Sequence, residues 1–231
     1  MLFAERHRKL GRHGSRVHER SEDLLTSTTV QLLRYIPLQE GLIAILARVR
    51  QVLPNGTLAG LPAWLQIQSI SSVEYECWKR VGRSEPDIVV TLCNGTLPLG
   101  RIVIEVKLDS TKSSEESVGV EGQSPRDQLA KYWSGLEDRN LKALGVVYLT
   151  SQATPPMDEL AASLRSIPGD WLGWLSWGDV WAALRRSTHL AARDLTELLE
   201  VKQLNLFRGF EVSDVLPKLG TPIFGAWKKW M

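Results

Sequence analysis

Leucine and valine recur at helical spacing in several stretches of the chain. Residues 17–35 place them three or four positions apart, which predicts an amphipathic helix that ends at Pro37. Residues 38–52 repeat the pattern and stop at a Pro-Asn-Gly turn, so we expect a second helix there. Further helices are expected over residues 125–137, 157–166, 178–187 and 191–203.

The middle of the chain changes to alternating or continuously apolar patterns that are typical of strands. Residues 72–78 (SVEYECW) alternate, whereas residues 87–92 (DIVVTL) and 101–107 (RIVIEVK) are largely apolar. An Asn-Gly turn dipeptide joins the last two, so we expect these three strands to form an antiparallel meander. Two more strands are expected over residues 144–150 and 172–176.

The order of these segments predicts an α/β fold, with an α/β/α sandwich around a central mixed sheet and extra helices at the C-terminus. A length of 231 residues suits a single domain. Within it we expect a basic N-terminal arm over residues 1–16, a core over residues 17–170, and a Trp-rich extension of the same domain over residues 171–231.

Composition and cysteine usage exclude several classes of protein. No apolar run approaches the ~18 residues that a membrane-spanning helix needs, and the first residues lack the apolar stretch of a secretory signal. The two cysteines, Cys77 and Cys93, are too few for a disulfide scaffold, a four-cysteine zinc site or a four-cysteine iron–sulfur cluster. We therefore expect a cytoplasmic protein with reduced thiols and no membrane association.

Positive charge is concentrated at the N-terminus. The chain has a formal net charge of +2, yet residues 1–20 alone carry six basic and two acidic side chains, which leaves the remainder at −2. Arg12 and Arg16 in this arm are candidates for contacts with nucleic-acid phosphates. The alternative is a solvated terminus without a ligand.

A pair of carboxylates marks the ends of two neighbouring predicted strands. Asp87 follows Pro86 at the start of one strand, and Glu105 lies near the end of the next, two residues before Lys107. Two such carboxylates can share one hard divalent cation, and Lys107 projects from the same strand face as Glu105. The arrangement suits metal-assisted hydrolysis of a phosphodiester, in which the metal activates water and the lysine orients that water or offsets charge. The alternative is an exposed strand end whose charges are solvated.

Two polar patterns fall on predicted helices before and after these strands. Gln128 and Tyr132, in the pattern QxxxY, lie four positions apart and share a helix face. His18 and Glu22, in the pattern GxxxHxxxE, do the same near the N-terminus. Because an acidic residue also stabilises a helix N-terminus, Glu22 has that alternative role, and Glu19 is then the alternative carboxylate from this helix.

The four motifs GxxxHxxxE, PD, ExK and QxxxY occur in this order over residues 14–132. In that order they resemble the RecB-type branch of the PD-(D/E)xK nuclease superfamily, which includes the nuclease domains of bacterial recombination helicases and the CRISPR adaptation exonucleases. The resemblance implies a restriction-endonuclease-like core. Glu105 stands where the branch often has aspartate, and two cysteines cannot hold the iron–sulfur cluster of some members.

The resemblance also implies a ligand set for Mg²⁺ or Mn²⁺. Asp87 and Glu105 would be metal ligands, together with the backbone carbonyl of Val106. Glu22 would reach the metal directly or through water, and His18 would be an added ligand, as in the RecB branch. An oxygen-rich set with one imidazole suits these two ions.

The same resemblance assigns roles to the remaining residues. Lys107 would be the catalytic lysine, and Gln128 and Tyr132 would position it or the substrate backbone. Tyr132 and Lys131, on the same predicted helix, would contact nucleic acid. The implied function is metal-dependent hydrolysis of DNA, in a mobile-element or anti-phage defence context. A catalytically weak nucleic-acid-binding module within a larger complex and an RNA nuclease are the alternatives, because these motifs address phosphate and not the sugar.

Nine tryptophans are many for a chain of this length, and four of them cluster over residues 171–181. We therefore expect the C-terminal third to be a candidate interface for a second copy of the chain or for a partner protein. Core packing is the alternative for the cluster.

Overall fold

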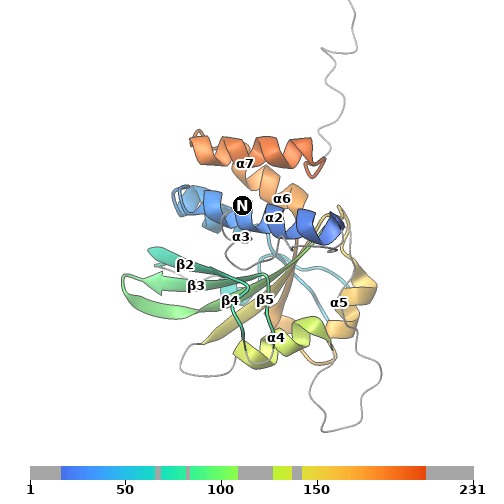
Figure 1. Ribbon diagram of the computed structural model, residues 1–231. Helices are drawn as coiled ribbons and strands as arrows, with labels where there is room; N and C mark the ends of the chain where they lie inside the picture. The colour runs from blue at the N-terminus through green and yellow to red at the C-terminus, as the bar shows by residue number, and fades with distance from the viewer. Residues whose placement is uncertain (1–16, 66–68, 82–83, 109–126, 137–141, 207–231) are drawn as a thin grey trace, which may run out of the picture.

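The computed structural model describes residues 17–65, 69–81, 84–108, 127–136 and 142–206, with the backbone alone over residues 17–21. They form an α/β fold with one six-stranded mixed sheet (Figure 1). The α-helices are α2 (Val17–Leu33), α3 (Ala44–Leu46), α4 (Gln128–Leu136), α5 (Met157–Ser163), α6 (Trp177–Leu184) and α7 (Leu190–Val201). Shorter turns of other helix types are η1 (Gln39–Ile43), η2 (Ala63–Leu65) and η3 (Gly169–Trp171). None of the helices in the described part of the chain has the length and apolar character that a bilayer crossing requires.

The sheet has the strand order β1-β6-β5-β4-β3-β2. Its strands are β1 (Arg50–Gln51), β2 (Ser72–Cys77), β3 (Ile88–Asn94), β4 (Leu97–Lys107), β5 (Ala143–Thr150) and β6 (Leu172–Ser176). The predicted antiparallel meander is confirmed, because β2 pairs with β3 and β3 pairs with β4. In the turn between β3 and β4, Gly95 adopts a positive φ of 59°. β4, β5 and β6 are parallel, so their carboxyl ends meet at the same edge of the sheet.

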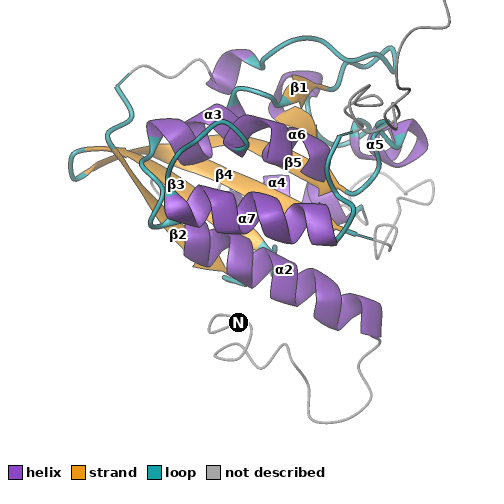
Figure 2. Ribbon diagram, turned by 90° about the horizontal axis from the view of Figure 1, so that it is seen from above, coloured by secondary structure: helices purple, strands orange, loops and turns teal. Residues whose placement is uncertain are grey.

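Helices cover both faces of the sheet (Figures 1 and 2). α2, α3, α6 and α7 lie over one face, and α4 and α5 lie under the other. The apolar side chains of β4 alternate accordingly: Ile104 belongs to the first core, and Val103 belongs to the second. The α/β class and the mixed sheet are therefore confirmed.

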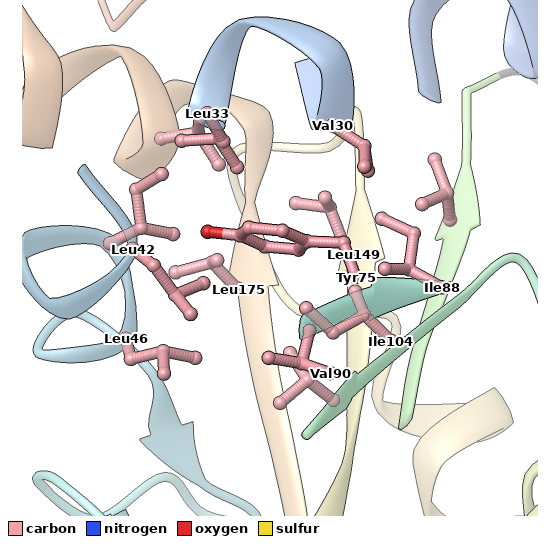
Figure 3. Packing of buried hydrophobic residues seen from close by; sticks show 14 of the residues in the cluster. Val30, Leu33, Leu42, Leu46, Tyr75, Ile88, Val90, Ile104, Leu149 and Leu175 are labelled. Carbon is pink, nitrogen blue, oxygen red and sulfur yellow. The ribbon is translucent and has the colours of Figure 1, made fainter. Parts of the chain in front are cut away.

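The larger core lies between the sheet and the layer that begins with α2 (Figure 3). Tyr75, Val90 and Ile104 project from the three strands of the meander into this space. Leu33 of α2 and Leu42 of η1 close it from the helical side. This packing holds α2 across the sheet, with the helix N-terminus near the carboxyl end of β4.

The helix predicted over residues 38–52 is wrong in its second half. α3 ends at Leu46, and Arg50 and Gln51 form β1, which pairs with β6. The guanidinium of Arg50 is bonded to Asp179 and lies 4.3 Å from the centroid of the Trp174 ring. These tertiary contacts stabilise extended backbone where the local pattern favours a helix.

The clustered tryptophans are mostly core. Trp174 and Trp177 are fully buried, and Trp181 is 1% exposed. Trp171 is half-buried, with its ring centroid 5.2 Å from that of Trp133. For these side chains the alternative of core packing is therefore confirmed, and an interface through the C-terminal third stays a prediction. The remaining tryptophans of that third lie outside the described residues.

Candidate active site

The candidate site forms where β4 extends beyond its neighbour β3. The pairing of β3 with β4 ends at Ile104, which leaves later N–H groups of β4 without a strand partner on that side. The Val106 N–H donates to Asp87 Oδ2 at 2.8 Å, and the Leu108 N–H donates to Glu22 Oε2 at 2.9 Å. Two carboxylates thus replace the missing strand, because buried backbone donors require acceptors. Asp87, directly before β3, and Glu22 of α2 therefore bind neighbouring N–H groups of the same backbone segment.

Lys107 connects the carboxylates of the site. Its Nζ lies 2.9 Å from Glu105 Oε1 and 3.2 Å from Glu22 Oε1. Glu105 is 2% exposed and Lys107 is 9% exposed, so the alternative of a solvated strand end is wrong. Glu22 lies more than one turn inside α2, and its carboxylate is used by β4, so it does not serve merely to stabilise the helix N-terminus.

Gln128 contacts the site from α4. Its Nε2 donates to Glu105 Oε1 at 2.7 Å and to the Tyr132 hydroxyl at 2.9 Å. Gln128 therefore holds Glu105 Oε1, the same oxygen that lies 2.9 Å from Lys107 Nζ, and its expected role toward the lysine or the substrate stays a prediction. Tyr132 is 3% exposed, so in this structure the expected contact of its side chain with nucleic acid is wrong.

Burial and mutual charge shift the pKa values of the site. Burial and the negative charge of Glu105 raise the pKa of Asp87 from 3.8 to about 8. Burial also raises the pKa of Glu22. For Lys107, burial lowers the pKa, but the charges of Glu105, Asp87 and Glu22 outweigh that effect and raise it. The lysine is therefore an ammonium ion at neutral pH, whereas Asp87 holds a proton more readily than an ordinary aspartate.

The donor atoms present suit a hard divalent cation in part. Glu105 Oε2 is buried and has no hydrogen-bond partner among the described residues, so a lone pair is free in the middle of the site. A residue in a strand turns its N–H and C=O toward the same neighbour, so the Val106 carbonyl lies on the Asp87 side of β4. Among the side chains that the structure describes, no group of three or more His, Cys, Asp and Glu is arranged to hold a metal ion. Two carboxylates and a carbonyl are nevertheless enough protein ligands for Mg²⁺, because this ion usually completes its coordination with several waters or substrate oxygens.

Several predicted site residues are not placed in this cluster. His18 and Glu19 lie in α2, but their side chains are outside the described residues. Arg12 and Arg16 also lie outside them. Lys131 lies on α4, where its N–H donates to the Asp127 carbonyl, and its side chain is half-buried.

Two polar pairs near the site were not found from the sequence. Tyr148 lies opposite Glu105 in the register of β4 with β5, and its hydroxyl donates to Glu159 Oε2 at 2.6 Å. Asp127 is fully buried directly before α4 and accepts from the Ala130 N–H at 3.1 Å.

Asp127 marks the start of the helix. α4 begins at Gln128, because the Asp127 carboxylate caps its N-terminus and also accepts from the Ser163 hydroxyl of α5 at 2.9 Å. Residues 125 and 126, where the helix was expected to begin, lie outside the described residues. An aspartate just before an apolar-periodic run was the signal available for this cap. No local pattern links Tyr148 to Glu159. The position of Tyr148 opposite Glu105 depends on the register of β4 with β5, which the sequence does not show.

The site therefore unites residues of three separated motifs, namely PD, ExK and QxxxY, with a carboxylate from α2. Comparisons of this chain with protein-family models, with curated proteins and with solved structures found no match.

Proposed function

We propose that this protein is a divalent-metal-dependent nuclease that hydrolyses DNA phosphodiester bonds. The observation that carries the proposal is the buried cluster in which Lys107 lies within 3.2 Å of Glu22 and Glu105. These residues are far apart in the chain, and burying an ion cluster is costly unless the groups are paired or used. We further propose a restriction-endonuclease-like fold, which the layer order and the mixed sheet support.

Asp87, Glu105 and the Val106 carbonyl are the proposed holders of Mg²⁺ or Mn²⁺. Two observations support this assignment: Glu105 Oε2 has no hydrogen-bond partner among the described residues, and burial and the charge of Glu105 raise the pKa of Asp87, so a cation between the two carboxylates would be stabilising. When bound, such an ion polarises the phosphodiester and lowers the pKa of its water. Glu22 completes the negative charge of the site from the other layer.

Lys107 supplies positive charge and does not act as a base. Its raised pKa keeps it protonated at neutral pH, so it has no lone pair to accept a proton. An ammonium in a site this buried stabilises the negative charge that develops on phosphate in the transition state. Gln128 and Tyr132 are positioning residues, since they act through Glu105.

The test is a cleavage assay on linear and circular DNA and on RNA, with Mg²⁺, with Mn²⁺ and with chelator. We expect metal-dependent cleavage of DNA by the wild type and none by Lys107→Ala or Lys107→Gln. Lys142→Ala is the matched control, because Lys142 is exposed just before β5, at the opposite end of the sheet.

Each contrary result has a definite reading. Equal cleavage by the Lys107 variants would show that the site is assigned wrongly. Nucleic-acid binding without cleavage under any metal would indicate the binding module, and cleavage of RNA alone would indicate a ribonuclease. Circular dichroism of each variant confirms that the fold is retained.

A further inference from the structure

A second charged feature lies in the helical layer, away from the candidate active site. It is a cleft of about 480 Å³ at the C-terminal end of α6. Arg48, from the segment after α3, lines it together with Arg185 and Arg186, and Trp181 forms part of its wall. We call this feature the arginine cleft.

The three guanidinium groups of the arginine cleft are not neutralised by any carboxylate of the described residues. Arg50, only two positions from Arg48, is by contrast bonded to Asp179. All three cleft arginines are exposed, so their charge faces solvent. A concave surface lined by three such cations is a site for an anion.

Carboxylates near the cleft are used by other groups. Glu200 of α7 accepts from the Trp181 indole N–H at 2.9 Å. Glu40 of η1 accepts from the Ser187 hydroxyl at 2.6 Å. Neither acidic group lines the cleft or forms an ion pair with one of its three arginines.

Stabilisation of the helix end accounts for only part of the cluster. Cations near a helix C-terminus offset its partial negative charge. Arg48 does this directly, since its Nη2 donates to the Ala182 carbonyl at 3.3 Å. That bond uses one of five donors and covers a carbonyl that would otherwise repel an anion. Arg185 and Arg186 make no side-chain hydrogen bond to any described carbonyl, so their donors are available.

The form of the cleft indicates phosphate rather than a base. The Arg185 guanidinium lies 5.2 Å from the Trp181 ring centroid, which holds the cation over the ring. Because Trp181 is 1% exposed, its ring offers no free face on which a base could stack. Guanidinium forks bind phosphate through two parallel hydrogen bonds. The cleft can therefore hold a sugar–phosphate backbone without reading its sequence.

The arginine cleft is distinct from the candidate active site. α6 begins immediately after β6, at the sheet edge where the parallel strands end. Its eight residues carry Arg185 about 12 Å along the helix axis from that point.

We propose that the arginine cleft is a non-catalytic phosphate-binding site that holds the backbone of a nucleic acid. Arg48, Arg185 and Arg186 are its binding residues. The site does not require the candidate active site to be functional, since its contribution is to affinity.

The test measures binding of a fluorescent 30-base-pair DNA duplex to the full chain by anisotropy, in chelator and over a series of salt concentrations. We expect Arg185→Gln/Arg186→Gln to weaken binding about tenfold, with the log–log salt slope reduced by about 0.9 for each phosphate that the variant no longer neutralises. Arg165→Gln/Lys142→Gln removes the same charge from two exposed residues that do not line the cleft, and should bind as the wild type does.

Three results would overturn the proposal. The first is equal affinity and salt slope for the cleft variant and the wild type, and the second is an equally weakened control variant. The third is tighter binding of polyglutamate of matched charge than of the duplex, which would indicate an acidic protein partner. The two proposals can fail separately, because binding is measured in chelator and does not depend on cleavage. If the protein cleaves no DNA with Mg²⁺ or Mn²⁺ but the cleft variant still binds the duplex more weakly, the proposed nuclease is refuted and the assignment of the cleft stands.

Discussion

The site at the end of β4 and the arginine cleft both contain several charged side chains, but the charges are buried and paired in the first and exposed and unpaired in the second. Lys107 is 9% exposed and lies against two carboxylates, whereas Arg185 and Arg186 are exposed and unpaired with any described acid. Charges that are buried together interact strongly and shift one another's pKa values, while charges in water are screened within about 10 Å. This difference fits the two roles that we propose, chemistry on one bond in the first region and attraction of a charged polymer in the second.

The largest expected effect is that of Glu105→Gln on cleavage. The substitution keeps the shape of the side chain but removes the charge that faces Lys107 and the proposed metal. We expect the cleavage rate to fall by about 10³-fold, because the substitution removes a preorganised charge at the reacting group. Duplex affinity in chelator, measured by anisotropy, should not fall, since it depends on the surface cations. A parallel fall in affinity would break the distinction between the two regions.

A smaller effect is expected for Gln128→Leu. The variant removes the donor that holds Glu105 Oε1 at 2.7 Å but leaves every proposed ligand in place. We expect cleavage to fall about 10–100-fold, as is usual when a metal ligand no longer has its hydrogen-bond partner. The dependence of the rate on Mg²⁺ concentration should shift to higher values, which a purely structural role would not produce. Gln128→Glu, which brings a like charge to Glu105, should be worse than Gln128→Leu.

The buried site should also make the metal-free protein sensitive to pH. The pKa of Asp87 is raised from 3.8 to about 8, so between these values the native state holds a proton that the unfolded state has released. Stability therefore falls as pH rises through this window. The raised pKa of Lys107 adds stability that is constant here and disappears only at much higher pH. We expect a decrease in Tm of about 5 °C or more between pH 5 and pH 8 in chelator.

Asp87→Asn is the control for this pH effect, because it keeps an acceptor for the Val106 N–H but cannot ionise. Its Tm should change less over the same range. A wild-type Tm that rises from pH 5 to pH 8 would contradict the assigned state of Asp87.

The smallest effect is expected for a single change in the arginine cleft. Arg186→Gln should weaken duplex binding about threefold at ~0.1 M salt, and the difference should shrink as salt increases. Cleavage at saturating DNA should be unchanged, because the cleft contributes affinity and not chemistry. A reduced rate at saturation would instead connect the cleft to the candidate active site.

Local pattern was sufficient for much of the molecule. One alternating segment, two apolar runs and an Asn-Gly turn predicted the meander of β2, β3 and β4, and the two-residue period of a strand placed Lys107 and Glu105 on one face. Helical spacing brought Gln128 and Tyr132 together, and their side chains are hydrogen-bonded. These features depend on residues close in the chain, where a fixed backbone period determines which side chains meet.

Local pattern failed where partners are distant. The helical spacing of residues 38–52 was overridden at Arg50 by pairing with β6 and by Asp179, which is 129 positions away. The tryptophan cluster had no single strand or helix period because its members pack in both cores. The contact of Gln128 with Glu105 was also not predicted, since only the packing of α4 against the sheet brings the two side chains together.

Residue types and their periods were enough to predict an α/β fold and the candidate residues Asp87, Glu105 and Lys107. Tertiary structure alone brought Glu22 to Lys107, 85 positions away, and joined Arg48 to the end of α6. The reason is physical. Buried backbone donors and charges are costly unless they are paired, and their partners come from whichever packed element lies beside them. The spacing of residues along the chain does not show which element that is.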